Sequence, residues 1–176
     1  CGNVPKARSV FDETSFPEFV SWNVLISAYI QHGQFPVAFN FLTKMLNEGL
    51  PPDIVSYICI LKACAKTRDI RKGKEVHSTI VISHSLEKDI ALGNALIDMY
   101  AKFGMLKKAR QVLEELPIRN IISWSALIGG YAQEGLGHEA LLCFEQMQRE
   151  GFLPDWITYI SILKACGSVG VIDKGR

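Results

Sequence analysis

The side chains best suited to specific hydrogen bonding recur at matching places along this chain. Asn23, Asn94 and Ser125 each lie a few residues into a predicted helix. Amides and hydroxyls donate and accept hydrogen bonds, but they do not break covalent bonds unless a base or a metal activates them. Lysines able to pair with an anion lie in similar predicted helices, at Lys62, Lys66, Lys102 and Lys164. This chemistry favours binding of a polar, anionic ligand over catalysis.

No catalytic motif accompanies these residues. The sequence contains no H-x-E followed by C-x2-C, no G-x4-G-K-[ST] and no G-x-S-x-G. No C-x2-C pair or histidine cluster has metal-ligand spacing. We therefore expect no cofactor, no metal site and no enzymatic activity in this stretch.

The cysteines and histidines are expected to be structural. Cys64 and Cys166 occupy matching places in an apolar helical pattern, which predicts small buried residues in a reducing compartment. The histidines do not recur at matching places, which favours a surface or groove-edge location. The full sets are Cys1, Cys59, Cys64, Cys143 and Cys166, and His32, His77, His84 and His138.

Charge and hydropathy argue against two classes of protein. Nineteen basic and 18 acidic residues leave a net charge of +1, which is weak evidence against strong non-specific binding of polyanions. No run of 18 apolar residues occurs, so we expect no membrane-spanning helix. Both ends fall inside a repeating pattern, so we expect a piece of a longer protein, and the missing targeting segment says nothing about location.

An internal repeat shows which predicted helices carry these polar residues and lysines. A shift of 102 residues pairs 74 positions, and 29 of these pairs are identical. Each long repeat divides into three helix pairs of 35, 36 and 31 residues. The fold prediction is an all-α, right-handed solenoid of antiparallel helix pairs. The predicted units are 1–18 (the end of one unit), 19–53, 54–89, 90–120, 121–155 and 156–176 (the start of one unit).

One face of each predicted first helix mixes small apolar, polar and lysine side chains. At 100° per residue, the ninth and thirteenth residues of a unit lie within about 20° of the second, and the fifth lies about 60° to one side. The second places hold Val20, Val55, Ala91, Ile122 and Ile157. The fifth places hold Asn23, Ile58, Asn94, Ser125 and Ile160. This face suits single-stranded RNA, because a base can wedge between apolar residues, meet a polar side chain at its edge and leave its phosphate to a lysine.

The chain resembles the pentatricopeptide repeat proteins of the plant PLS subclass, which cycle P-, L- and S-type units of these three lengths. P-type units are marked by Ser21-Trp22-Asn23 and Ser123-Trp124-Ser125, and L-type units by Leu61-Lys62-Ala63-Cys64 and its copy at 163–166. The S-type unit is marked by 93–102 followed by Ala109-Arg110-x-Val112. On this pattern 19–53 and 121–155 are P-type, 54–89 and 156–176 L-type, and 1–18 and 90–120 S-type.

The resemblance implies which residues select RNA bases. In the family, the fifth and last residues of a unit choose the base together. Carried over by position, Asn23 with Asp53 favours U, Asn94 with Asn120 favours C or U, and Ser125 with Asp155 favours G. Ile58 with Asp89 lacks a polar fifth residue and selects little or nothing. The implied target is Y-N-Y-G, read 5′ to 3′.

The resemblance also implies a cellular role. Related proteins are RNA-binding factors of mitochondria or plastids, many of them directing RNA editing, and some carry a C-terminal deaminase-like domain. A protein editing cofactor could meet the L-type unit. A different function, a helical scaffold that binds proteins, remains open from the residues alone. The polar residues could also be ordinary helix caps and turn residues. Trp22 and Trp124 are expected in the core.

Overall fold

The structure is a computed structural model that describes residues 4–14, 18–82 and 89–173, with the backbone alone for residues 82 and 168–173. All regular elements in these ranges are α-helices, which confirms the all-α prediction. None of these helices has the length and apolarity needed to cross a membrane. They are α1 (Val4–Glu13), α2 (Phe19–Gln31), α3 (Phe35–Asn47), α4 (Ile54–Thr67), α5 (Ile70–Ile82), α6 (Ile90–Lys102), α7 (Leu106–Glu115), α8 (Ile121–Gln133), α9 (Gly137–Arg149) and α10 (Trp156–Asp173).

The helices form two compact parts, one through Ala63 and one from Cys64 onward. Five helices begin at Phe19, Ile54, Ile90, Ile121 and Trp156, the residues at which the sequence division opens a unit. We call these five the first helices, and α3, α5, α7 and α9 the second helices. The exact division into units stays a prediction.

An aromatic cluster forms the core of the N-terminal part. The ring of Phe41 on α3 lies between Trp22 and Tyr29 of α2, with centroid distances of 5.8 and 5.5 Å. Phe11 of α1 meets the Trp22 ring edge-on at 4.8 Å. Edge-on and offset ring pairs add to the hydrophobic effect. Trp22 is only 3% exposed, which confirms its core location.

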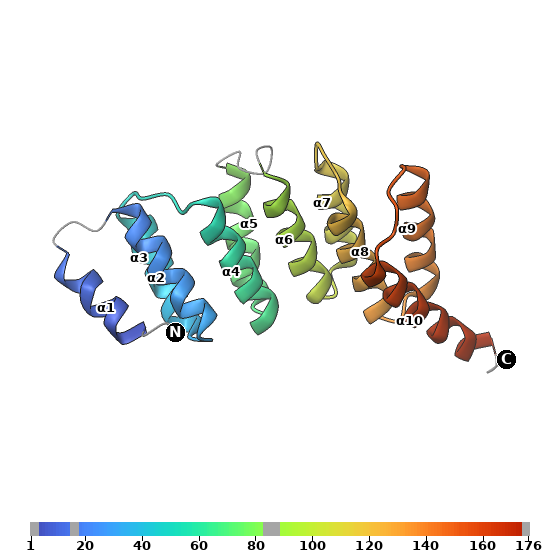
Figure 1. Ribbon diagram of the computed structural model, residues 1–176, viewed down its shortest axis with the longest axis horizontal. Coiled ribbons are helices and arrows are strands. Elements are labelled where there is room, and N and C mark those ends of the chain that lie inside the picture. Colours follow the sequence, from blue (N-terminus) through green and yellow to red (C-terminus); the bar gives the residue numbers. More distant parts are fainter. Residues whose placement is uncertain (1–3, 15–17, 83–88, 174–176) are drawn as a thin grey trace. The chain divides into compact units, whose positions relative to one another are not determined.

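First helices pack in succession in the C-terminal part. Helix α8 contacts both α6 and α10, while α7 and α9 pack against α6 and α8 respectively (Figure 1). Trp124 of α8 is 1% exposed, as predicted for a core residue. Tyr100 and Tyr131 are also buried there, so the recurring aromatic residues hold the layers together.

Glycines terminate most of the first helices. Gly33, Gly104 and Gly135 have φ values of 73°, 72° and 74°, in the left-handed region that side chains disfavour. Arg68 takes the same conformation, with φ 54°, between α4 and α5, so one non-glycine residue adopts the strained turn.

Two structural expectations for single residues need correction. Cys64 is fully buried, but Cys166 is exposed, because it lies on α10 and no described helix follows to cover it. His32 and His138 are exposed as expected, but His77 is only 8% exposed because it lies between α5 and α6. Cys1 and His84 lie outside the described residues.

Adjacent glycines of α8 differ sharply in the space around them. A Cβ at Gly130 would lie 2.7 Å from the Cβ of Ala101 and 2.9 Å from a methyl of Leu106. A Cβ at Gly129 would meet only the hydroxyl of Ser161, at an ordinary 3.6 Å. The close approach of α6 and α8 therefore requires glycine at position 130 alone.

We expect Gly130→Ala to lower the free energy of unfolding by about 1–3 kcal/mol, because α6 and α8 must separate. Gly129→Ala is the matched control and should raise it by up to about 1 kcal/mol, because alanine favours the helix. Urea unfolding followed by circular dichroism measures both values. Equal effects of the two substitutions would refute this account of the α6–α8 contact.

Candidate nucleic-acid interface

The polar residues at the fifth places lie in seams between first helices. Asn23, Asn94 and Ser125 are 5%, 9% and 9% exposed. They are therefore not solvated surface residues. Helix α8 packs against α6 on one side and α10 on the other, and Asn94 and Ser125 hydrogen-bond across these two boundaries. In the N-terminal part, Ser27 of α2 lies 3.8 Å from Cys59 of α4, so Asn23, one turn earlier on α2, lies beside the equivalent boundary. We use the word seam for this boundary between successive first helices.

The last residue of four predicted units caps the next first helix, whereas Glu18, at the end of the unit 1–18, forms no side-chain cap at α2. Asp53 accepts the amide of Ser56 at 2.7 Å, at the start of α4. Asn120 accepts the amide of Ser123 at 3.0 Å, and Asp155 accepts the amide of Thr158 at 2.8 Å. These bonds satisfy amides that have no partner within their own helix. The capping role considered from sequence is therefore present, and it fixes the side chain at the rim of the seam.

The structure joins the fifth and last residues in two of the three predicted base-reading pairs. The Asn94 amide donates to the Oδ1 of Asn120, at 3.4 Å. Ser125 lies 2.6 Å from the hydroxyl of Thr158, which donates to Asp155 Oδ1 at 2.7 Å. The first contact is direct and long, whereas the second is a short chain through a residue of the following helix.

Several polar atoms in these seams have unused hydrogen-bonding capacity. Both amide atoms of Asn23 and the Oδ1 of Asn94 are buried and have no partner among the described residues. A buried polar atom without a partner costs about 1–3 kcal/mol. A ligand with complementary donors and acceptors would recover that free energy on entering the seam. Ser125, by contrast, already has a partner.

Hydrogen bonding keeps the Asp155 carboxylate charged. Burial by itself would raise the pKa of Asp155, but the amide and hydroxyl of Thr158 and the hydroxyl of Ser125 favour the charged form and lower the pKa overall. At neutral pH this side chain is therefore a carboxylate, able to accept further hydrogen bonds but not to donate one.

Aliphatic residues at the second places are exposed. Val20, Val55, Ile122 and Ile157 are 50%, 61%, 61% and 47% exposed, and Ala91 is exposed as well. They precede the fifth places by one turn of the same helices. A flat ring could therefore rest on such a side chain while its edge points toward the seam. The structure is thus compatible with the sandwiching role predicted for these five residues.

The four predicted phosphate-binding lysines are also exposed. Lys62 and Lys66 lie on α4, Lys102 on α6 and Lys164 on α10. Lys102 forms an ion pair with Asp98 at 2.7 Å. An exposed pair of this kind is worth about 1 kcal/mol or less. A phosphate could therefore replace Asp98 as the partner of Lys102.

The fifth places of the predicted L-type units have no polar side chain. Ile58 is half-buried and Ile160 is 55% exposed. Asp89, the last residue of the first of these units, accepts the amide of Ala91 at 2.7 Å as the cap of α6. This unit keeps its cap but has no side chain to hydrogen-bond a base edge.

Sequence reasoning missed two hydroxyl groups, Ser123 and Thr158, at the third place of a first helix. Ser123 forms a reciprocal capping box with Asn120, accepting its backbone amide at 2.9 Å. Thr158 links Ser125 to Asp155. The spacing of a cap and a hydroxyl three residues apart was visible in the sequence and could have identified both. The described residues contain no group of acidic, histidine or cysteine side chains able to hold a metal.

Curated plant proteins resemble nearly the whole chain. The pentatricopeptide repeat-containing protein At5g27110 of Arabidopsis thaliana is 38% identical over 99% of this chain and 25% of its own length. The chloroplastic At4g18520 is 35% identical over 100% of this chain and 28% of its own length. The mitochondrial At3g02330 is 40% identical over 89% and 17%. This chain thus spans about a quarter of the length of such relatives.

Solved structures share the fold. A crystal structure of the pentatricopeptide repeat protein PPR10, in complex with an 18-nt psaJ RNA element, has a TM-score of 0.76 at 18% identity, covering 98% of this chain and 27% of PPR10. PPR10 from maize in another crystal structure has a TM-score of 0.71 at 22% identity, covering 96% and 25%. At these identities the likeness establishes the fold alone.

Family models cover most of the chain. The PPR repeat family model matches residues 17–66 and 119–168, and a PPR repeat model matches residues 94–121. These matches include α2, α3, α7, α8 and α9 and much of α4, α6 and α10. This stretch is a repeat array rather than an enzyme domain. The chain belongs to the pentatricopeptide repeat family.

Proposed function

We propose that this stretch of chain binds single-stranded RNA, with one base at each seam that has a polar fifth residue. The observation that carries the proposal is the unused hydrogen-bonding capacity of Asn23 and Asn94, each in a first helix with an exposed aliphatic residue one turn earlier. A base between aliphatic side chains buries its faces, and its edge supplies the missing partners. The RNA-bound crystal structure of PPR10 supports this reading.

The base preferences follow from the paired side chains. Asn23 with Asp53 favours U, Asn94 with Asn120 favours C or U, and Ser125 with Asp155 favours G. The unit of Ile58 and Asp89 accepts any base, so the target is Y-N-Y-G. Because Asp155 is held as a carboxylate, it can accept hydrogen bonds from the amino and imino groups of guanine, which suits the third preference.

The parent protein would be an organellar factor of the PLS subclass, acting in RNA editing or another RNA-processing step. The unit lengths support the subclass, and the chloroplastic and mitochondrial names of two relatives support an organellar location. This stretch would supply only part of the parent protein's sequence specificity, because each base contact discriminates between bases by only about 1–3 kcal/mol.

Protein binding at the L-type units is a second role. Ile160 is 55% exposed at a fifth place, and Val55 and Ile157 are exposed one turn earlier in their helices. Apolar side chains at both places give a base no hydrogen bond, but they suit the apolar surface of a protein such as an editing cofactor. A scaffold that binds only proteins would lack any preference among RNA bases.

Filter binding of short RNAs with all four bases at each position of Y-N-Y-G tests the proposal. We expect the favoured base to bind about tenfold tighter at the three selective positions, with no preference at N. Affinity should fall as salt rises, because phosphate contacts release counterions. Equal affinity for every base at all three positions would reject base selection.

Asn94→Ser, with Asn120 kept, should shift the preference of its unit from pyrimidine toward A. A shorter side chain leaves room at the seam for a purine, whose edge reaches farther. The measurement is binding of RNAs that differ only at this base. Asn47→Ser, the same change at an exposed residue of α3, is the control and should leave all preferences unchanged. An unaltered pyrimidine preference in Asn94→Ser would argue against Asn94 as a base-selecting residue.

Thr158→Val tests whether the hydroxyl positions Ser125 and Asp155. Loss of the hydroxyl should raise the pKa of Asp155 toward its ordinary value of 3.8 and weaken the preference for G about threefold or more. The folded-state pKa is depressed, so the stabilising contribution of Asp155 is present above pH 3.8 and is lost as pH falls through the folded-state pKa.

Carboxyl NMR titration measures the Asp155 pKa, and RNA binding measures the base preference. Thr158→Ser keeps the hydroxyl and should restore both. Thr43→Val removes a helix-surface hydroxyl that bonds the Phe39 carbonyl and serves as the control. If Thr158→Val changed neither quantity, Thr158 would lie beside the cap residue Asp155 without a role in selecting the RNA base.

A further inference from the structure

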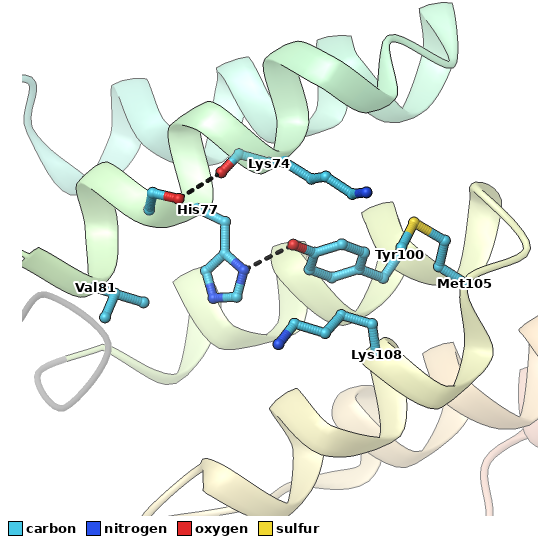
Figure 2. Close-up of a pocket in the computed structure, with 7 residues that line it drawn as sticks. Lys74, His77, Val81, Tyr100, Met105 and Lys108 are labelled. Carbon is cyan, nitrogen blue, oxygen red and sulfur yellow. Dashed lines mark hydrogen bonds between the residues drawn. The ribbon is translucent and has the colours of Figure 1, made fainter.

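A pocket lies away from the seams, where the second helices α5 and α7 meet α6. It has a volume of about 590 Å³ and is lined by Lys74, His77, Val81, Tyr100, Met105 and Lys108 among others. Figure 2 shows the His77 ring projecting from α5 toward Tyr100, with the ammonium groups of Lys74 and Lys108 on opposite sides of this pair. None of the residues that line this pocket was predicted to contact RNA.

The polar floor of the pocket is a histidine–tyrosine pair. His77 Nδ1 and the Tyr100 hydroxyl are 2.8 Å apart, and the His77 side chain is more than nine-tenths buried. The other ring nitrogen, Nε2, has no partner among the described residues. When the tyrosine hydroxyl donates to Nδ1, the ring proton is on Nε2, which is then an unpaired donor.

The charged groups of the pocket are of one sign. Among the described residues, no aspartate or glutamate lines it, and neither Lys74 nor Lys108 forms an ion pair. The Lys108 ammonium donates to the neutral amide oxygen of Gln111, at 2.9 Å. Two ammonium groups on opposite sides of the pocket, with no carboxylate among its described lining residues, give it a positive potential.

The electrostatic setting of His77 agrees with this description. Burial lowers the pKa of His77, Lys108 lowers it further, and Glu115 opposes them. Among the described residues, the groups near the ring are Lys74 on α5, Tyr100 on α6, and Lys108 and Glu115 on α7, of which Glu115 acts on the ring without lining the pocket. An added anion would favour the imidazolium form of His77, and it would therefore raise the pKa that burial and Lys108 lower.

We propose that this pocket binds the phosphate of a phosphomonoester whose organic part is apolar. A phosphomonoester carries nearly two negative charges at neutral pH, which matches two ammonium groups better than a single carboxylate does. Its remaining oxygens can accept from Nε2 of His77. The volume exceeds what phosphate alone needs, and Val81, Met105 and the Tyr100 ring offer an apolar wall for the rest of the ligand.

Phenyl phosphate is the first probe, because it combines a phosphomonoester with a small apolar ring. Imidazole NMR titrations with and without the probe should show a saturable response of His77 and a higher His77 pKa. His32 and His138 are exposed and remain as internal controls, which should not respond. An unchanged His77, or an equal response of all three histidines, would overturn the proposal.

Charge variants locate the binding site. We expect Lys74→Gln and Lys108→Gln each to weaken phenyl phosphate binding about tenfold, as expected for losing one charged hydrogen bond. Lys107→Gln changes an exposed lysine on the same helix as Lys108 but outside the pocket, and should have no effect. Circular dichroism confirms that each variant is folded. Binding that persists in the Lys74→Gln, Lys108→Gln double variant would reject the site.

Competition identifies the source of the phosphomonoester. Benzoate should compete at least tenfold less well than phenyl phosphate, and equal competition would contradict selection for phosphate. If a 5′-phosphorylated oligonucleotide displaces the probe and its 5′-hydroxyl counterpart does not, the natural ligand is an RNA end. If neither displaces it, the ligand is a small phosphorylated molecule. The outcome is independent of base selection at the seams, since none of the residues changed belongs to them.

Discussion

The structure depends on a hydrogen bond that crosses from four of the predicted units to the next. Asp53, Asp89, Asn120 and Asp155 each accept backbone amides at the start of the following first helix. A helix that began without such a cap would leave its first amides unsatisfied at a packed boundary. The cap therefore fixes where α4, α6, α8 and α10 begin and with it the position of the fifth residue, one turn later.

Packing between first helices then determines how the polar residues present themselves. Because α6 and α8 approach closely enough to require Gly130, the side chain of Asn94 is largely covered and reaches the cap at Asn120. In the seam between α8 and α10, the hydroxyl of Thr158 stands between Ser125 and Asp155 and joins them through two hydrogen bonds. The two seams thus share one backbone plan and differ in the number of side chains that join the pair, which is how a repeat can vary its chemistry without changing its fold.

The helices, their order and the buried tryptophans could be predicted from sequence, because apolar periodicity and glycine breaks are local signals. The burial of Asn23, Asn94 and Ser125 could not, since a helical wheel places them beside an open face and carries no information about the neighbouring helix. His77 escaped prediction for the same reason, because its partner Tyr100 is 23 residues away on another helix. Cys166 was wrongly expected to be buried, as its copy Cys64 is, since identical residues in a repeat need not have the same neighbours.

The dual role of the cap limits how such an array can evolve. All four cap residues are aspartate or asparagine, which are among the strongest helix-capping side chains. If the same side chain also selects a base, then only residue types that can still cap a helix are tolerated at this place. A substitution that alters the preferred base would disturb the first turn of the next helix, and so the base at the neighbouring position as well. When related proteins diverge, the bases preferred by neighbouring units are therefore expected to change together rather than one at a time.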